Sequence, residues 1–231
     1  MIDRPVLSLR LAAIYDAIPE CDRVVDVGTD HGYIPITCVL TGKAGKGLAL
    51  DVREGPLQRA RVNAAKYNVS DKIGFSLTNG LDGIALSSDD CVVIAGMGGL
   101  ESISIIKEAG RIPCKIVLQP QRSAFDLRKF LDINGYTIIS EKIVSERGKY
   151  YPVILSEYTG VCTQLSMIEA YAGKNTIFAA DKDPKLYTDE LPDGYLEYLI
   201  EIARKRKKSD PIFEELFDKL LKLQNSQPGR R

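Results

Sequence analysis

The sequence predicts an α/β fold in which helices cover both faces of a mostly parallel sheet. Two observations lead to this prediction. Short apolar runs alternate with segments of helical periodicity from about residue 23 onward, as expected for strands that are buried on both faces. The alternation stops after Gly135, where two extended segments follow each other across a short turn. The parallel strands therefore give way to an antiparallel hairpin at the end of the sheet.

The elements of the sheet follow one another in a regular order. A short helix is expected within Met1–Ile18, before the first strand. The five expected parallel strands are Arg23–Val27, Gly47–Val52, Lys72–Leu77, Cys91–Gly96 and Lys115–Gln119. The helices expected after them are Ile34–Leu40, Pro56–Tyr67, Leu100–Ala109 and Ser123–Ile133, the last with Ser123 as its N-cap. The hairpin consists of Tyr136–Glu146 and Tyr150–Thr159 around the turn Arg147–Lys149.

A second region begins near Val161 and is expected to be helical. Its expected helices are Gln164–Ala172, Gly194–Ser209 and Pro211–Gln224, with an acidic loop at Asp181–Asp193. Ser209–Pro211 separates the last two helices, and Pro211 suits a first helical turn. Both of these helices carry one apolar stripe, so we expect them to pair antiparallel. We therefore divide the chain into residues 1–160 and residues 161–231.

Composition is that of an ordinary globular protein. The chain has 231 residues, of which 45% are hydrophobic and 27% charged, and no apolar run approaches the roughly 20 residues of a membrane span. The five cysteines show no CxxC pair, which favours free thiols in a reducing cytoplasm over a disulfide or zinc framework. The net charge is zero, yet Arg204–Lys208 contains five consecutive basic residues. A neutral total can therefore conceal one basic face.

The segment Val24–Pro35, VVDVGTDHGYIP, has the pattern of a strand, a tight loop and a helix start. In a Rossmann-type sheet this is where a nucleotide-like cofactor binds. A dinucleotide fingerprint requires three glycines, whereas this loop has only Gly28 and Gly32. Asp26 and Asp30 would repel a pyrophosphate but suit a ligand with ammonium and sulfonium charges. The loop therefore favours S-adenosylmethionine over NAD.

Further polar and glycine-rich groups stand at the ends of the later strands. Asp51 ends the second strand, about 20 residues after Gly28, where an acidic side chain accepts ribose hydroxyls. Arg10 is a candidate partner of the cofactor carboxylate. The complete expected cofactor set is Arg10, Asp26, Gly28, Thr29, His31, Asp51, Val52, Asn79, Gly80, Ala95, Gly96 and Met97. A parallel sheet with such ends and a terminal hairpin is similar to that of class I methyltransferases.

The absence of one sequence motif narrows the class of substrate. Enzymes that methylate exocyclic amines of bases usually carry an Asp/Asn-Pro-Pro-aromatic stretch after the fourth strand. Ala95–Gly98, AGMG, stands at that place here. The site is therefore not expected to act on an exocyclic amine.

VVDVGTDHGYIP, NGL, IAGMGG and LQPQ together resemble the bacterial tRNA adenine-N1 methyltransferases that modify position 22, the TrmK family. The resemblance extends from LSLRL near the N-terminus to the hairpin that ends near Thr159, and GKYYPVI falls in the expected place. Family members usually have asparagine where Gln121 stands. The C-terminal third matches in its helical architecture rather than in motifs.

The resemblance implies methyl transfer from S-adenosylmethionine to N1 of an adenine in tRNA. From the cysteine usage we expect a cytoplasmic protein without a metal site. N1 is unprotonated at neutral pH, so orientation is expected to supply most of the catalysis. Asp30, His31 and Gln121 are the expected neighbours of the reacting base. The residues expected to contact RNA are Arg122, Arg204, Lys205, Arg206, Lys207 and Lys208. Protein partners are not indicated.

Three other functions remain open from the residues alone. The chain could methylate another RNA, a protein or a small molecule. It could be a methyltransferase-like module that binds RNA without catalysis, although the acidic residues at the first two strand ends disfavour this. An NAD-linked oxidoreductase is disfavoured by the missing third glycine and by the terminal hairpin.

Overall fold

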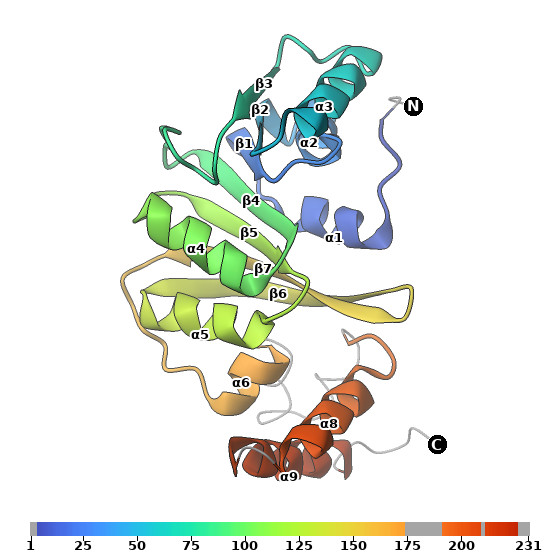
Figure 1. Cartoon of the computed structure of the whole chain (residues 1–231), viewed down its shortest axis with the longest axis vertical. Helices are drawn as coiled ribbons and strands as arrows, with labels where there is room; N and C mark the ends of the chain where they lie inside the picture. Colours follow the sequence, from blue (N-terminus) through green and yellow to red (C-terminus); the bar gives the residue numbers. More distant parts are fainter. Residues whose placement is uncertain (1–3, 174–190, 209–210, 226–231) are drawn as a thin grey trace.

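A seven-stranded sheet forms the centre of the protein (Figure 1). The structure is a computed structural model that describes residues 4–173, 191–208 and 211–225. The strands lie in the order β3-β2-β1-β4-β5-β7-β6. They are β1 (Cys21–Val27), β2 (Ala44–Asp51), β3 (Ile73–Leu77), β4 (Asp90–Met97), β5 (Lys115–Pro120), β6 (Tyr136–Glu146) and β7 (Lys149–Tyr158). The pairings among β1 to β5 are parallel, and β7 runs antiparallel to both β5 and β6.

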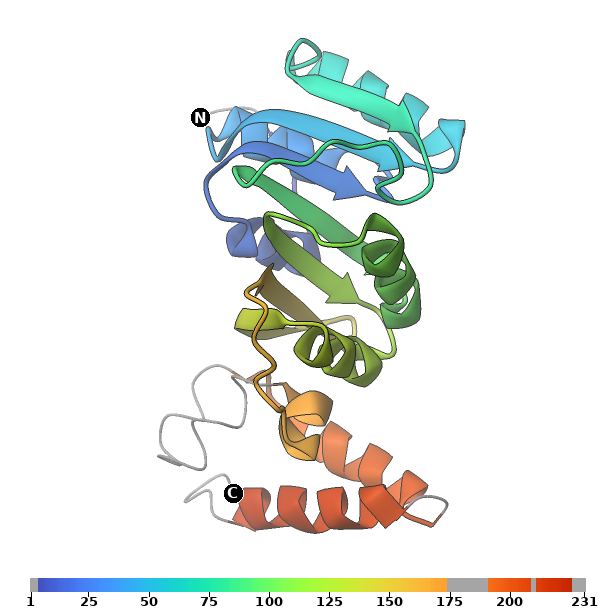
Figure 2. The same cartoon turned by 90° about the vertical axis from the view of Figure 1, so that its left-hand side faces the viewer.

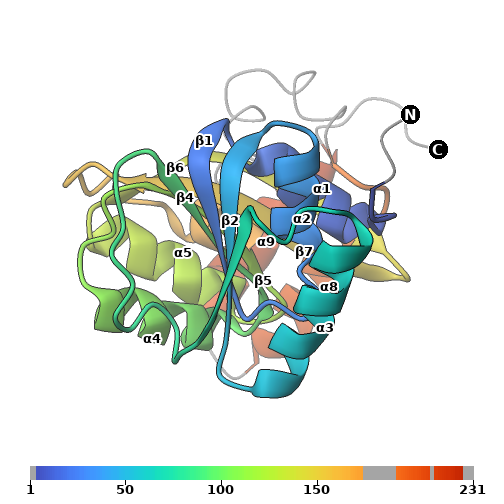
Figure 3. The same ribbon diagram turned by 90° about the horizontal axis from the view of Figure 1, so that it is seen from above.

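Helices cover both faces of this sheet, as the sequence predicts (Figure 3). One face carries α1 (Leu9–Ala17), α2 (Tyr33–Leu40) and α3 (Glu54–Lys66), and the other carries α4 (Gly99–Ala109) and α5 (Ala124–Ile133). Successive residues of β4 alternate between two cores. Val92 and Ile94 pack with residues of α4 and α5, whereas Cys91 and Val93 pack with residues of α1 and α2. Since both faces are buried, the strand sequences are continuously apolar.

The hairpin of β6 and β7 is confirmed, and its turn has two residues rather than three. Arg147 and Gly148 have φ angles of 52° and 73°. Positive φ at both central residues is the type I′ pattern, whose twist matches that of paired strands.

Cys38, Cys91 and Cys114 are buried free thiols, as expected.

Several helix starts differ from the sequence-based bounds, and the caps of three of them are informative. The first helix begins only at Leu9, because the Ser8 side chain accepts a hydrogen bond from the Leu11 amide at the N-cap. The helix expected from Gln164 is α6 (Met167–Ala172), which begins after a capping box between Ser166 and Glu169. The prediction for Ser123 was partly wrong. It occupies the N-cap position of α5, but its φ is 56° and its side chain makes no capping hydrogen bond.

The C-terminal region contains α6, α8 (Tyr195–Arg206) and α9 (Pro211–Asn225). Their apolar faces form a separate core that includes Ile143 of β6, so this region packs against the hairpin edge of the sheet. The helices α8 and α9 contact each other, but they are inclined rather than strictly antiparallel (Figure 2). Most of the expected acidic loop, and the Ser209–Asp210 break, lie outside the described residues.

Candidate cofactor and substrate site

Asp26 and Asp51 lie side by side at the carboxyl edge of the sheet. Asp26 of β1 pairs in register with Ala49 of β2, two residues before Asp51. The backbone amides of Gly28 and Thr29 both donate to the Leu50 carbonyl, at 2.9 Å and 2.8 Å. These bonds hold the loop after β1 against the end of β2. The two carboxylates thus lie at the edge of the sheet at which open α/β folds bind their ligands.

The environment of Asp26 disfavours its negative charge. The residue is 8% exposed. Burial raises the pKa of Asp26 to about 6, and the nearby charge of Asp51 contributes in the same direction. The Thr29 side chain opposes this rise, although its Oγ1 is buried without a partner that meets hydrogen-bond geometry in the described residues. A bound positive charge would stabilise the Asp26 carboxylate, and a ligand donor would satisfy Thr29.

The loops after β1 and β4 lie against each other. Gly28 has a φ of 74°, and a Cβ there would lie 2.7 Å from Met97 Cε. The register of β4 against β5 shifts between Ala95 and Met97, which leaves Gly96 as an unpaired bulge with a φ of 78°. Bulges of this kind are common beside active sites. The loops that carry the expected cofactor residues after β1 and β4 therefore meet.

Arg10 and Gln121 converge on the same bulge. A Cβ at Gly96 would lie 3.7 Å from Arg10 Nη1 and 3.9 Å from Gln121 Nε2. Arg10 Nη1 donates to Gln119 Oε1 at 2.8 Å, and the guanidinium lies 5.8 Å from the centre of the Tyr151 ring. The Gln121 backbone amide donates to the Met97 carbonyl at 2.9 Å. A cation and a carboxamide thus flank the opening beside Met97.

Asp30 and His31 form a second group on the outer side of the first loop. Asp30 accepts a hydrogen bond and ion pair from Arg59 of α3, and His31 Nε2 lies 3.4 Å from Asp30 Oδ2. The His31 ring stacks on Tyr33 at 5.2 Å. In the described part of the chain, no hydrogen bond or ion pair joins this group to Gln121. The three expected neighbours of the reacting base therefore belong to two groups.

The remaining expected cofactor residues differ in surroundings. Val52, next to Asp51, is 59% exposed although it is apolar, and Asn79 is exposed after β3. Gly80 is buried, and a Cβ there would lie 3.2 Å from Ile105 Cγ2 of α4. Gly80 thus supports the packing of α4, while Val52 and Asn79 present side chains to the crevice edge.

The basic run lies at the end of α8 and is partly held by neighbours. Arg204 forms an ion pair with Glu201 at 2.5 Å. Arg206 lies 4.4 Å from the centre of the Phe213 ring, and Lys207 lies 4.1 Å from that of Phe217. Lys205 and Lys208 are exposed. Arg122 is also exposed and lies over Gly98, far along the chain from this run.

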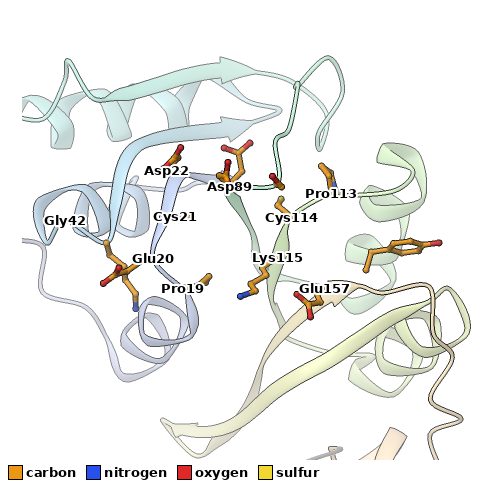
Figure 4. Close-up of a pocket in the computed structure, with 14 residues that line it drawn as sticks. Pro19, Glu20, Cys21, Asp22, Gly42, Asp89, Pro113, Cys114, Lys115 and Glu157 are labelled. Carbon is orange, nitrogen blue, oxygen red and sulfur yellow. The ribbon is translucent and has the colours of Figure 1, made fainter.

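A hollow of about 520 Å³ lies at the opposite edge of the sheet from Asp26 and Asp51 (Figure 4). Residues at the start of strands line it, among them Cys21, Cys114 and Lys115, together with acidic side chains such as Asp89 and Glu157. This is the amino edge, away from Asp26 and Asp51. Since ligands of such sheets bind at the carboxyl ends of the strands, this hollow is not the candidate site.

Sequence reasoning missed two residues that organise the site. Gln119 is fully buried at the end of β5, with its Nε2 donating to the Pro120 carbonyl at 3.0 Å while its Oε1 holds Arg10. A glutamine inside an apolar strand was the available signal. Arg59 had no such signal, because its pairing with Asp30 depends on how α3 packs.

The described residues contain neither a cluster of metal-binding side chains nor a helix that could span a membrane. Within them, no group of three or more His, Cys, Asp or Glu side chains is arranged to hold a metal ion. No described helix is long and apolar enough to cross a membrane.

Comparisons with known proteins agree with this geometry. A family model described as a methyltransferase domain matches residues 7–154. The tRNA (adenine(22)-N(1))-methyltransferase of Bacillus subtilis is 30% identical over 229 residues, covering 93% of this chain and 94% of that protein. The chain belongs to the tRNA (adenine(22)-N1)-methyltransferase family.

Solved structures of similar proteins extend the likeness to the whole architecture. TrmK of M. capricolum, solved with S-adenosyl-homocysteine, gives a TM-score of 0.76 at 25% identity, covering 96% of this chain and 97% of that one. Sp1610 of Streptococcus pneumoniae, solved with S-adenosyl-L-methionine, gives 0.76 at 27% identity, covering 95% and 99%. The likeness to tRNA (adenine(22)-N1)-methyltransferases therefore includes the C-terminal helices as well as the sheet.

Proposed function

We propose that this protein transfers a methyl group from S-adenosylmethionine to N1 of adenine 22 in tRNA. The observation that carries the proposal is the convergence of Asp26, Asp51 and the bulge at Gly96 on one crevice, in a chain of this family. A tRNA substrate also assigns the protein to the cytoplasm.

The residues of the crevice fit the methyl donor. Asp26 and Asp51 offer carboxylates to an ammonium group and to ribose hydroxyls, and the unpartnered Thr29 Oγ1 offers one further polar contact. Arg10 offers a guanidinium to the donor carboxylate. Val52 and Asn79 offer an apolar side chain and an amide to the adenine ring. When bound, S-adenosylmethionine supplies an electrophilic methyl group on sulfur.

The protein contributes mainly orientation. The N1 lone pair lies in the plane of the adenine ring, so the base must leave any pairing before it can attack. Gln121 Nε2, beside the bulge at Gly96, is placed to hold this base edge toward the methyl group. Asp30 and His31 line the outer rim of the loop after β1. N1 needs no deprotonation, and the exocyclic amine can lose its proton after transfer, which agrees with a site organised for alignment.

The direct test is methylation of a defined RNA. Purified protein is incubated with labelled S-adenosylmethionine and an unmodified tRNA transcript that carries adenine at position 22, and the digested RNA is examined by mass spectrometry. We expect labelled 1-methyladenosine, and none when position 22 is changed to guanine. Label in another base, in protein or in a small molecule would overturn the proposal, as would absence of label from a protein that binds the donor.

Residues 161–231 are proposed to hold the tRNA, while residues 1–160 carry the chemistry. The exposed Lys205 and Lys208 and the ring-supported Arg206 and Lys207 offer positive charge at one end of α8. Contacts of this kind neutralise phosphates and position the RNA without reading its sequence.

Changing both Lys205 and Lys208 to Gln is expected to weaken tRNA binding and flatten its salt dependence. Each lost phosphate contact lowers the slope of log K against log salt by about 0.7 to 0.9. Titrations of tRNA at several salt concentrations measure this slope. Lys66 and Lys72, exposed at the amino edge of the sheet, are the matched controls, and their Gln variants should retain the wild-type slope. A wild-type slope in the Lys205 and Lys208 variant would remove the run from the interface.

A further inference from the structure

A groove of about 450 Å³ separates the carboxyl edge of the sheet from the C-terminal helices. Its walls come from the loop after β5, the start of α5, the start of β7, and the helices α6, α8 and α9, which lie together in Figure 1. The volume is within the range of small-ligand pockets. Six aromatic side chains line it: Phe125, Tyr150, Tyr171, Tyr195, Tyr198 and Phe213.

These rings contact one another but do not close the groove. The Tyr150 ring lies 5.2 Å from Tyr195 and 5.1 Å from Tyr198, and Tyr171 lies 5.5 Å from Phe213. Tyr198 nevertheless remains 46% exposed. A ring that is supported on one side by other rings and open on the other is suited to stack against a further planar group.

A polar atom in the groove also lacks a partner. The Tyr171 hydroxyl is buried and makes no hydrogen bond within the described residues. Burial raises the pKa of Tyr171 to about 12, with Arg206 opposing the rise, so the hydroxyl stays protonated at neutral pH. A buried hydroxyl without a partner costs free energy unless a ligand or water satisfies it. An unpartnered hydroxyl therefore lies buried beside the aromatic faces of the groove.

One end of the groove reaches the reacting end of the candidate site. Gln121 and Arg122 line it. The Gln121 backbone amide donates to the Met97 carbonyl at 2.9 Å, and a Cβ at Gly98 would lie 3.3 Å from Arg122 Nε. Both lining residues therefore border the loop after β4. Gln121 and Arg122 therefore connect the groove to the loop that carries Gly96.

The charges around the groove favour an anionic chain. Arg122 and Arg206 line it, and Asp126 is the exposed acidic side chain among its lining residues. Arg128, also in the lining, is neutralised by Glu141. The remaining basic side chains of residues 204–208 follow Arg206 directly. Aromatic faces between cationic groups are the common recognition surface for unstacked RNA bases.

We propose that this groove receives the base of a nucleotide adjacent to the methylated adenine, stacked on Tyr198. The inference rests on the proposed function, because it requires a tRNA whose target base has left its stack. Extruding one base also removes a stacking surface from its neighbours. A second aromatic-lined site compensates for this loss and holds the strand in its opened form.

The test removes the Tyr198 ring and the neighbouring RNA base, first separately and then together. Tyr198→Ala is compared with Tyr198→Phe, which keeps the ring, and with Tyr67→Ala at the end of α3 as a matched control. Each protein is titrated with tRNA transcripts that are intact or carry an abasic nucleotide on either side of position 22. We expect Tyr198→Ala to weaken tRNA binding about tenfold, and Tyr198→Phe and Tyr67→Ala to bind as the wild type does.

The decisive outcome is the coupling between protein and RNA. At one neighbouring position, the abasic RNA should bind the wild type about tenfold more weakly but lose no further affinity for Tyr198→Ala, since the two changes remove the same contact. Additive losses of affinity would overturn the inference. Full tRNA affinity in Tyr198→Ala would also overturn it, and would leave a protein as the ligand of the groove. Labelled 1-methyladenosine from wild-type protein and intact tRNA, measured in the same experiment, shows separately that the proposed function holds. Titration with S-adenosylmethionine and a melting curve show that Tyr198→Ala is folded.

Discussion

Replacing Asp26 with Asn is expected to stabilise the protein without its cofactor while weakening S-adenosylmethionine binding at least tenfold. Both effects follow from the buried carboxylate. Burial raises the pKa of Asp26 from 3.8 to about 6, so its charged form is disfavoured in the folded state. The shift corresponds to roughly 3 kcal/mol at neutral pH. Asn removes this cost, apart from the desolvation of its own amide, and also removes the charge that attracts the donor ammonium.

The pH dependence has a defined sign. A carboxyl whose pKa is raised on folding binds more protons in the folded state, so its contribution to stability falls as pH rises from about 4 to about 6 and is constant above. Melting curves between pH 4 and pH 7.5 should show this fall in the wild type and lose it in Asp26→Asn. Asp82→Asn, at an exposed position, is the control.

Calorimetric titration at pH 7.5 measures the other half of the prediction. A tenfold loss of affinity corresponds to about 1.4 kcal/mol. A variant that is more stable and binds the donor as tightly as the wild type would contradict the role of Asp26 in the site. A variant that is less stable at pH 7.5 would contradict the cost of its burial.

Sequence patterns predicted the sheet well because they are local. A continuously apolar strand such as β4 needs no partner to be recognised, and residues at successive strand ends must meet at one edge. The order of the parallel strands along the chain, together with their polar ends, is enough to place Asp26 and Asp51 at a common edge. The helix starts were less accurate, because the Ser8 cap and the Ser166–Glu169 capping box each depend on one or two hydrogen bonds.

The features that the sequence did not predict depend on long-range packing. Arg59 reaches Asp30, and Gln119 holds Arg10 across 109 positions. The aromatic groove brings Phe125, Tyr150 and Tyr198 together from three elements. Periodicity describes each element alone, so contacts between separate elements remain outside its reach. The spatial order of the strands in the sheet also depends on such contacts, so the sequence patterns did not predict it.

Replacing Glu141 with Gln is expected to destabilise the protein by about 3–5 kcal/mol. Glu141 Oε1 accepts from Arg128 Nε at 2.9 Å and from Nη2 at 2.6 Å, and the two side chains are 0% and 1% exposed. Without the carboxylate, the guanidinium is left buried and uncompensated. Urea denaturation at neutral pH measures the loss. Glu157→Gln, on the neighbouring strand β7 and less buried, provides the control, and equal stability of the two variants would refute the prediction.

The double variant R128M/E141M separates stability from positioning. Replacing both partners of a buried ion pair with apolar side chains is often neutral or stabilising, so the free energy of unfolding should recover part of the loss. Arg128 Nη1 also donates to the carbonyls of Ala170 and Tyr171, at 2.9 Å and 3.0 Å, and these contacts fix the end of α6 against α5. Methionine cannot replace them. The double variant should therefore keep its affinity for S-adenosylmethionine but exchange the amide hydrogens of α6 faster. It should also bind tRNA more weakly, because α6 supports the groove through Tyr171. Wild-type tRNA affinity in a stable double variant would show that the ion pair does not position the C-terminal helices.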